Sequence, residues 1–162
     1  MVYVVMGVSG SGKTVVGKAL AAKLGLPFHD GDDFHPPANV AKMSAGIPLN
    51  DADREPWLRT LAGKIREWNA AGGAVLACSA LKESYRQQLR EGGDVRFIFL
   101  DVPKQLLAER LRGRTGHFMP VTLLDSQLAT LEIPEDAIRV SDTATIDETV
   151  AKIVAAIKTS GR

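Results

Sequence analysis

The feature that most restricts the fold of this chain is a glycine-rich run close to its amino end. The run consists of Gly7, Val8, Ser9, Gly10, Ser11, Gly12, Lys13 and Thr14. It fits the pattern G-x4-G-K-[ST], with an apolar stretch at residues 2–5 before it and a helical pattern after it. A chance match in an ordinary Gly/Ser loop would lack this context. We therefore expect a strand, a loop and a helix that together bind the phosphates of a nucleotide.

Each residue type in the run has a physical task. Glycines let the backbone curl so that successive N–H groups point at one anion. The helix that starts near Lys13 directs the positive end of its dipole at the same place, and the Lys13 ammonium adds a full charge over the outer phosphates. The hydroxyl of Thr14 can ligate Mg²⁺. The run thus predicts a nucleoside triphosphate and Mg²⁺ as cofactors.

The rest of the chain alternates short apolar stretches with helical patterns. The strand candidates are residues 2–5, 26–29, 74–78, 95–100 and 138–140. The helix candidates are 13–24, 38–45, a helix capped by Asp53 and ended by Gly72, 82–91, 104–112, 122–131 and 146–157. Continuous apolar strands separated by helices predict a parallel five-stranded sheet covered on both faces, an α/β fold of three layers, α/β/α. The length of 162 residues fits a single domain, 1–162.

Composition excludes several classes of protein. Hydrophobic residues make up 45% of the chain, enough for a core, and the net charge of +1 argues against a strongly basic nucleic-acid-binding protein. The single cysteine, Cys78, excludes an internal disulfide and leaves no Cys/His zinc spacing. The apolar start lacks the features of a signal peptide and is too short for a membrane span. We expect a cytoplasmic protein that binds neither nucleic acid nor membranes.

A pair of carboxylates, Asp30 and Asp32, flanks Gly31 at the end of the second strand candidate. Ligands of open parallel sheets bind at the carboxyl ends of the strands, so both carboxylates are expected to face the phosphate loop. One would hold Mg²⁺ through water, and the other would orient an attacking hydroxyl or accept its proton. The alternative is a solvated Asp-Gly turn. His35, close after the pair, is a further candidate for the same pocket.

A cluster of basic residues lies later in the chain and comprises Arg110, Arg112, Arg114 and His117. Arginines that close over transferring phosphates stabilise the charge of the transition state, and Gly113 and Gly116 would let this segment move as a lid. The alternative is a charged helix end, where cations are favoured in any protein.

Other signals separate the possible classes of nucleotide-binding protein. No D-x-x-G or N-K-x-D segment follows the phosphate loop, and no strand candidate ends in an Asp-Glu pair, which favours a small kinase over a switch or motor protein. Four further cations either are simply solvated or together hold an anionic substrate: Lys42, Arg54, Lys82 and Arg86. We expect Trp57, Trp68, Cys78 and His29 in the core.

The sequence resembles gluconokinases of the small P-loop type. Beyond the phosphate loop, the segments that carry the resemblance are Asp30-Gly31-Asp32, His35-Pro36, Asn39, Lys42-Met43, Gly46, Pro48-Leu49, Asp51, Asp53-Arg54, Pro56-Trp57-Leu58, Cys78-Ser79-Ala80-Leu81-Lys82, Tyr85-Arg86, Arg110-Leu111, Arg114, Gly116-His117-Phe118, Ser126-Gln127 and Thr130-Leu131-Glu132. They cover the chain up to about residue 132, and the middle segments are more specific than the phosphate loop, which many families share.

The resemblance implies an activity and an architecture. It implies transfer of the γ-phosphate of ATP to a hydroxyl of D-gluconate with Mg²⁺, giving 6-phospho-D-gluconate. It implies a fold like that of the nucleoside monophosphate kinases, with a substrate-binding segment at about residues 30–60 and a mobile lid at about 110–122. It also suggests a homodimer.

The resemblance and the residue chemistry agree on roles. Lys13 and the loop backbone would bind phosphates, Thr14 and Asp30 the metal, and Asp32 the reacting hydroxyl; the alternative is the reverse division of roles between the two aspartates. Arg54 is the first choice for the substrate carboxylate, because a guanidinium matches a carboxylate with two hydrogen bonds. The second choices for the substrate are His35, Lys42, Ser79 and Arg86, and the residues expected to close over ATP are Arg110 and Arg114.

Three alternatives stay open at this point. The first is another small-metabolite kinase, of the shikimate or nucleotide kinase type, which would share the phosphate loop, the acidic pair and the lid. The second is a nucleotide-binding module that acts as a sensor. The third is a structural domain with a relic loop.

Overall fold

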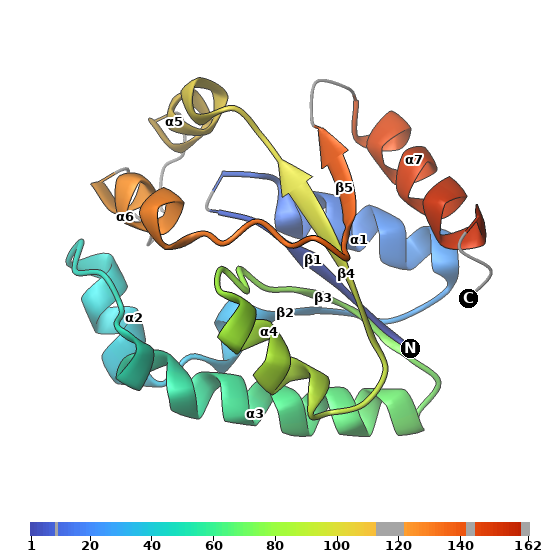
Figure 1. Ribbon diagram of the computed structural model, residues 1–162, viewed down its shortest axis with the longest axis horizontal. Coiled ribbons are helices and arrows are strands. Elements are labelled where there is room, and N and C mark those ends of the chain that lie inside the picture. The colour runs from blue at the N-terminus through green and yellow to red at the C-terminus, as the bar shows by residue number, and fades with distance from the viewer. Residues whose placement is uncertain (9, 113–121, 142–144, 160–162) are drawn as a thin grey trace.

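The computed structural model describes residues 1–8, 10–112, 122–141 and 145–159, of which 111–112 and 122–123 are described by their backbone alone. The elements in chain order are β1 (Val2–Met6), α1 (Lys13–Leu24), β2 (Phe28–Asp30), the 3₁₀ turn η1 (Gly31–Phe34), α2 (Pro37–Ser44), α3 (Asp51–Ala70), β3 (Ala74–Ala77), α4 (Glu83–Arg90), β4 (Val95–Asp101), α5 (Lys104–Arg112), α6 (Thr122–Thr130), β5 (Ile138–Ser141) and α7 (Ile146–Thr159). Figure 1 shows them along the chain.

The five strands form one parallel sheet in the order β2-β3-β1-β4-β5. Side chains of β1 alternate between two cores. Val4 and Met6 pack under α3 and α4, whereas Val5 packs against α1 and α7 on the opposite face. A parallel sheet is stable only when both faces are covered, which explains the nearly continuous apolar strands. The expected three-layer α/β/α fold is confirmed, and Figure 1 shows the two helical layers on either side of the sheet.

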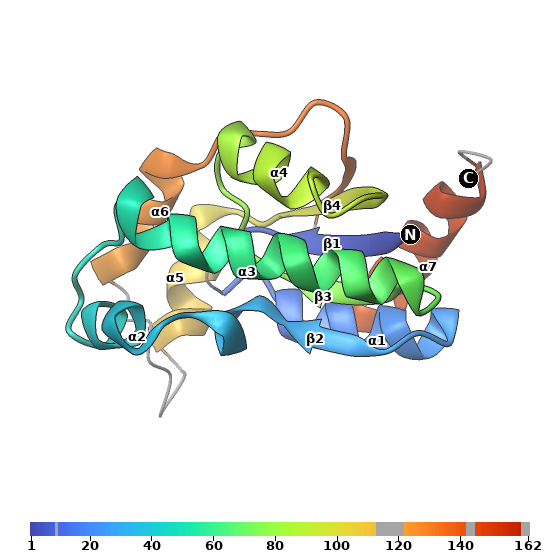
Figure 2. The same ribbon diagram turned by 90° about the horizontal axis from the view of Figure 1, so that it is seen from below.

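The strand register brings the predicted chemistry to one edge of the sheet. Val5 pairs with Ala77, and Ala77 pairs with Asp30, so the end of β2 lies level with the end of β1. The loops that follow these strands face α2, α5 and α6, while the N-terminus and the end of α7 lie at the other end of the molecule (Figures 1 and 2). This edge is where ligands of open parallel sheets bind.

The start of α3 differs from the sequence expectation. Asn50, not Asp53, is the N-cap: its side chain accepts a hydrogen bond from the backbone N–H of Asp53 at 2.8 Å. The Asp53 carboxylate in turn accepts from the backbone N–H of Asn50 at 3.0 Å, completing a reciprocal capping box. The expected start of α3 is therefore three residues too late in the chain, because Asp53 lies inside the first turn and completes the box from there.

The turn η1 was also not expected as an element. It begins directly after β2, and the Asp30 side chain caps it by accepting from the backbone N–H of Asp32 at 3.0 Å. A Cβ at Gly31 would lie 2.8 Å from the Ala77 carbonyl oxygen, so only glycine lets this turn approach β3 so closely. Among the described residues, none of the helices is long and apolar enough to cross a lipid bilayer.

Candidate active site

The phosphate loop has the geometry that its glycines predict. Gly10 and Gly12 have φ of +84° and +92°, a region that residues with a Cβ rarely adopt. Gly7 is needed for space as well, because a Cβ there would lie 2.7 Å from the buried Oγ of Ser11. The loop then enters α1, whose first N–H groups face the carboxyl edge of the sheet. Ser9 lies outside the described residues.

Two cations contact this loop. Lys13 Nζ donates to the Val8 carbonyl oxygen at 3.1 Å, which holds the ammonium across the loop. Arg110, on α5, donates from Nη1 to the Gly10 carbonyl oxygen at 3.0 Å, although 100 residues separate the two in sequence. Arg110, which is expected to close over ATP, therefore contacts the phosphate loop. Arg114, the other arginine expected over ATP, lies outside the described residues, as does most of the predicted lid.

Thr14 and Asp30 form the pair that could hold a metal ion. The Thr14 hydroxyl donates to Asp30 Oδ2 at 2.9 Å, so a hydroxyl and a carboxylate oxygen lie together beside the phosphate loop. These hard oxygen donors suit Mg²⁺, which in phosphate-transfer sites takes few protein ligands and completes its shell with water and phosphate. The described part of the chain contains no cluster of three or more His, Cys, Asp or Glu residues that could hold a metal ion.

Asp32 is the carboxylate best suited to act as a base. Burial among surrounding protein groups raises its pKa from 3.8 to about 6, with Asp30 and Asp33 acting in the same direction and Lys13 opposing them. Its side chain is still 42% exposed, so it is open to a reacting group. A carboxylate with a pKa near 6 is ionised at neutral pH and is a stronger proton acceptor than an ordinary aspartate.

Contacts with Trp57 and Asn39 hold His35 beside Asp32. Its ring stacks on Trp57 with centroids 4.1 Å apart, and its Nε2 lies 3.8 Å from Asp32 Oδ1. Asn39 Nδ2 lies 3.2 Å from Nδ1 on the other side of the ring. Burial, with the nearby Arg54 cation, lowers the pKa of His35 to about 4, so this imidazole is neutral at physiological pH.

Trp57 does more than fill the core, the only role expected for it. Its indole Nε1 donates to the Gly31 carbonyl oxygen at 2.7 Å in a buried position. This bond ties α3 to η1, between the two candidate aspartates. Trp68, further along α3, stacks on His29 with ring centroids 4.2 Å apart, but both residues are only half-buried and lie at the margin of the core. Cys78 is buried in the core, as expected. Burial raises the pKa of the Cys78 thiol to about 12, which makes it a poor nucleophile.

A pocket with about 530 Å³ of empty space lies between these elements. It brings together Lys13, Asp32, His35, Arg54 and Ser79 of the predicted site. The other lining residues are Met43, Pro48, Leu49, Trp57, Leu81, Ser126 and Gln127. The pocket opens to solvent, and its polar groups come from both the phosphate loop and the predicted substrate-binding segment.

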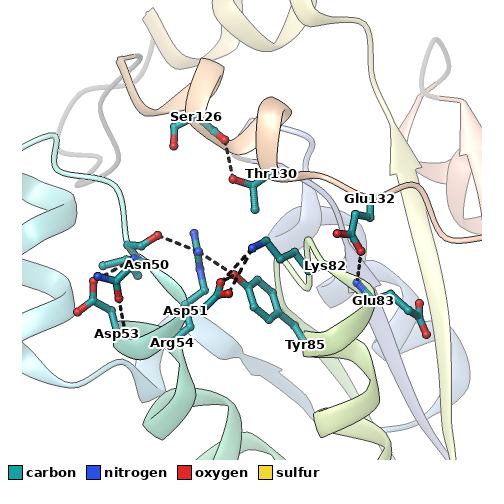
Figure 3. Close-up of polar contacts among 11 residues, drawn as sticks. Asn50, Asp51, Asp53, Arg54, Lys82, Glu83, Tyr85, Ser126, Thr130 and Glu132 are labelled. Carbon is teal, nitrogen blue, oxygen red and sulfur yellow. Dashed lines mark hydrogen bonds and ion pairs between the residues drawn. The ribbon is translucent and has the colours of Figure 1, made fainter.

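Arg54 is fixed by neighbours on two elements (Figure 3). Its Nη1 donates to the Leu49 carbonyl oxygen at 2.8 Å and to the Tyr85 hydroxyl at 3.0 Å. The Tyr85 hydroxyl lies 2.5 Å from Asp51 Oδ1, and Lys82 Nζ lies 3.1 Å from the same oxygen. The guanidinium carbon is also 5.3 Å from the centre of the Tyr85 ring. These contacts hold the arginine at the wall of the pocket.

Two of the expected substrate residues have partners elsewhere and do not line this pocket. Lys42 pairs with Asp53, with Nζ 2.9 Å from Oδ2, and so fastens α2 to the start of α3. Arg86 is only 1% exposed, and its guanidinium donates to the carbonyl oxygens of Ala80 at 2.7 Å and Glu132 at 2.9 Å. These contacts give both residues a role in holding the loops around the site.

The sequence analysis assigned no role to two polar residues that line this pocket, or to a third that contacts Arg54. Ser126 and Gln127 reach the pocket from α6, and Tyr85 reaches Arg54 from α4. The only signal for them was their place in the segments that resemble gluconokinases, because no local spacing links them to the phosphate loop. Figure 3 shows that α6 lies across from the Arg54 cluster, with Ser126 and Thr130 on the side nearer to it.

Comparisons with known proteins agree with this geometry. Residues 9–158 match the family model described as shikimate kinase. Gluconokinase of Gluconobacter oxydans (strain 621H) is 59% identical over 144 residues, which cover 85% of this chain and 80% of that protein. A gluconokinase structure from Sinorhizobium meliloti 1021 has a TM-score of 0.86 at 45% identity and covers 98% of this chain and 91% of that one. An unliganded sugar kinase from Janibacter sp. HTCC2649 has a TM-score of 0.91 at 44% identity, over 96% and 93%.

The match to the shikimate kinase family model and the similarity to gluconokinases are consistent with each other. The shikimate kinase model matches nearly the whole chain. The curated gluconokinase shares more than half of the aligned residues. The resemblance read from the motifs is thereby confirmed, and the protein is a kinase rather than a sensor module or a structural relic. The chain belongs to the gluconokinase family of P-loop kinases.

Proposed function

We propose that this protein transfers the γ-phosphoryl group of ATP to the 6-hydroxyl of D-gluconate, giving ADP and 6-phospho-D-gluconate. The observation that carries the proposal is a single pocket lined by the phosphate-loop Lys13, the carboxylate of Asp32 and the guanidinium of Arg54. The similarity to proteins named gluconokinase, at up to 59% identity, supports gluconate as the acceptor.

The reaction divides between the two sides of the pocket. On one side, the loop N–H groups and Lys13 hold the phosphates in line with the acceptor and neutralise charge that develops on the transferred group. On the other side, Asp32 orients the acceptor hydroxyl and takes its proton as the new O–P bond forms and ADP leaves with the electrons of the broken bond. The pKa of about 6 keeps Asp32 ionised and ready for this proton at neutral pH.

Thr14 and Asp30 would hold Mg²⁺ beside the phosphates. The metal supplies charge neutralisation for the triphosphate when it is bound. The hydrogen bond of 2.9 Å between these two side chains keeps both oxygen donors at the phosphate loop. The separation of tasks between Asp30 and Asp32 rests on their contacts: Asp30 binds Thr14, whereas Asp32 lines the pocket.

Arg54 recognises the carboxylate of the sugar acid. Its Nη1 is used by Leu49 and Tyr85, and in the described part of the chain no hydrogen bond occupies Nε or Nη2. These two nitrogens form the side of a guanidinium that matches a carboxylate with two parallel bonds. His35 and Ser79 line the same pocket and are in place to contact the polyol, while Lys42 and Arg86 support it through the loops.

A panel of acceptors tests the proposal. ADP release would be measured with ATP and D-gluconate, shikimate, nucleoside monophosphates or D-glucose, for the wild type and for Asp32→Asn. We expect turnover with gluconate alone, strongly reduced in the variant. Shikimate is the most demanding comparison, because the family model that matches this chain is that of shikimate kinase. Turnover with shikimate or a nucleotide but not with gluconate would reject the assignment.

The lid and the assembly stay predictions from the resemblance. We propose that residues 110–122 close over ATP, with Arg110 and Arg114 over the phosphates; the contact of Arg110 with Gly10 supports this. Hydrogen exchange of the 113–120 segment should slow when ATP and Mg²⁺ bind, and equal exchange in both states would count against a lid. A homodimer in the cytoplasm is also proposed, and sedimentation of the purified protein tests the dimer.

A further inference from the structure

The buried Tyr85 contacts Arg54, the residue proposed to bind the substrate carboxylate. Tyr85 is 4% exposed, and its hydroxyl makes hydrogen bonds within the polar cluster between α3 and α4. Figure 3 shows this hydroxyl next to Arg54, Asp51 and Lys82. Burying a tyrosine hydroxyl requires partners, and here both partners are charged.

The direction of the hydrogen bonds follows from the chemistry of the three groups. An ionised carboxylate can only accept, and a guanidinium can only donate. The single hydroxyl proton of Tyr85 therefore points to Asp51, and the oxygen lone pair accepts from Arg54 Nη1. Lys82, 3.1 Å from Asp51 Oδ1, favours the charged form of this carboxylate, and hydrogen bonds from Tyr85 and Lys82 lower the Asp51 pKa.

This chain of bonds determines which side of Arg54 is left for a ligand. The Leu49 carbonyl oxygen and the Tyr85 hydroxyl together take both N–H groups of Nη1. The guanidinium is planar, so fixing Nη1 at two points also fixes the directions of Nε and Nη2. We infer that Tyr85 is a positioning residue for the acceptor acid: with Asp51 it holds Arg54 so that its remaining N–H groups meet the carboxylate. This inference rests on the proposed function.

The test is Tyr85→Phe, which removes one oxygen and keeps the ring in the core. We expect the KM for gluconate to rise about tenfold, since a hydrogen bond to a charged group is lost, while kcat and the KM for ATP change less than twofold. A residue that only stabilised the fold would lower the amount of active protein and leave both KM values unchanged. The matched control is Tyr3→Phe, because Tyr3 is the other tyrosine of the chain and packs against the core on the α1 side.

A double-mutant cycle then shows whether Tyr85 acts through Arg54. In an Arg54→Lys background, Tyr85→Phe should change the KM for gluconate less than twofold, because lysine has no fork to orient. Asp51→Asn provides a second variant at an exposed position, with a smaller KM increase of about threefold expected, and it decides the matter if Tyr85→Phe does not fold. A fall in kcat with an unchanged KM, or equal effects in both Arg54 backgrounds, would overturn the inference. Wild-type turnover of gluconate is measured first, so a failure of the proposed function is seen separately.

Discussion

The two sides of the pocket are built in different ways. The phosphate side is made mainly of backbone from one continuous run, with Gly10 and Gly12 in left-handed conformations and Lys13 bound to the loop's own Val8 carbonyl oxygen. The acceptor side is made of side chains from separate elements. Its Asp32 belongs to η1 and its Arg54 to α3.

The difference shows that the acceptor side depends more on supporting contacts from neighbouring residues than the phosphate side does. Backbone N–H groups are fixed once the loop and α1 have formed, so the phosphate side needs few supporting contacts. Side chains must each be held by other residues, as Tyr85 and Leu49 hold Arg54, and as Asn39 and Trp57 hold His35. Changes on the phosphate side should therefore affect every acceptor equally, whereas changes on the acceptor side should affect gluconate selectively.

The largest effect is expected for Lys13→Ala. Loss of the ammonium over the transferred phosphate should lower kcat/KM about a thousandfold, because charge stabilisation dominates phosphoryl transfer. The measurement is steady-state turnover with ATP and gluconate. Lys18→Ala, an exposed lysine on the same helix, is the control and should retain activity. A Lys13 variant within tenfold of wild type would break the comparison, since the phosphate side would then work without the ammonium that is held across its loop.

Asp32→Asn should have the next largest effect. Asparagine keeps the shape but cannot accept the proton, so kcat is expected to fall about a hundredfold while ATP binding is retained. The neighbouring exposed Asp33→Asn is the matched control. Full activity of Asp32→Asn would show that another group accepts the proton.

The same residue predicts the pH dependence. Burial raises the pKa of Asp32 to about 6, and the base works only when it is ionised. The wild-type kcat/KM should therefore fall about tenfold for each pH unit below 6 and level off above 7. Asp32→Asn should lack this inflection. A profile with its inflection near pH 4, the ordinary range of an aspartate, would contradict the burial of the carboxylate in the working enzyme.

Arg54→Lys should give a smaller and more selective effect. Lysine keeps the charge but loses the two-pronged match to a carboxylate, so the KM for gluconate is expected to rise about tenfold with the KM for ATP unchanged. The control is Arg59→Lys, on the exposed side of α3 in an ion pair with Glu55. A parallel rise in the KM for ATP would show that the two sides of the pocket are not independent.

The smallest effect is expected for Asn50→Ala. It removes the N-cap of α3 and half of the capping box, so the free energy of unfolding should fall by about 1 kcal/mol. Denaturant unfolding measures this change. Because Asn50 lies on the acceptor side, the KM for ATP should not change, and an unchanged unfolding free energy would show that the cap contributes little.

The phosphate side could be predicted from the sequence because its geometry is local. The run from Gly7 to Thr14 contains the residues that shape the loop, and the apolar strand before it fixes its place in the sheet. The position of Asp30 beside Thr14 followed from a general rule, that parallel strands end at one edge, and the register of β2 confirms it.

The acceptor side was predicted only in part, because its contacts join residues far apart in the chain. Arg54 and Arg86 carry the same guanidinium, yet Arg54, the first choice for the substrate carboxylate, lines the pocket, whereas Arg86, a second choice, is bound to the Glu132 carbonyl oxygen, 46 residues away. Asn50 and Asp53 are both good caps, and only the structure shows that they cap each other. No spacing rule could have identified Tyr85 as the partner of Arg54.

The opposite pKa changes of His35 and Asp32 affect the tolerance of the fold to acid. The fold favours protonated Asp32, so this group loses stabilising free energy as pH rises from about 4 to 6. The fold favours the neutral form of His35, so the stabilising free energy from this imidazole is lost as pH falls from 6.5 to about 4. Over this shared interval the two contributions offset each other. A mildly acidic medium should thus switch off phosphate transfer well before it unfolds the polypeptide, and activity should return on neutralisation.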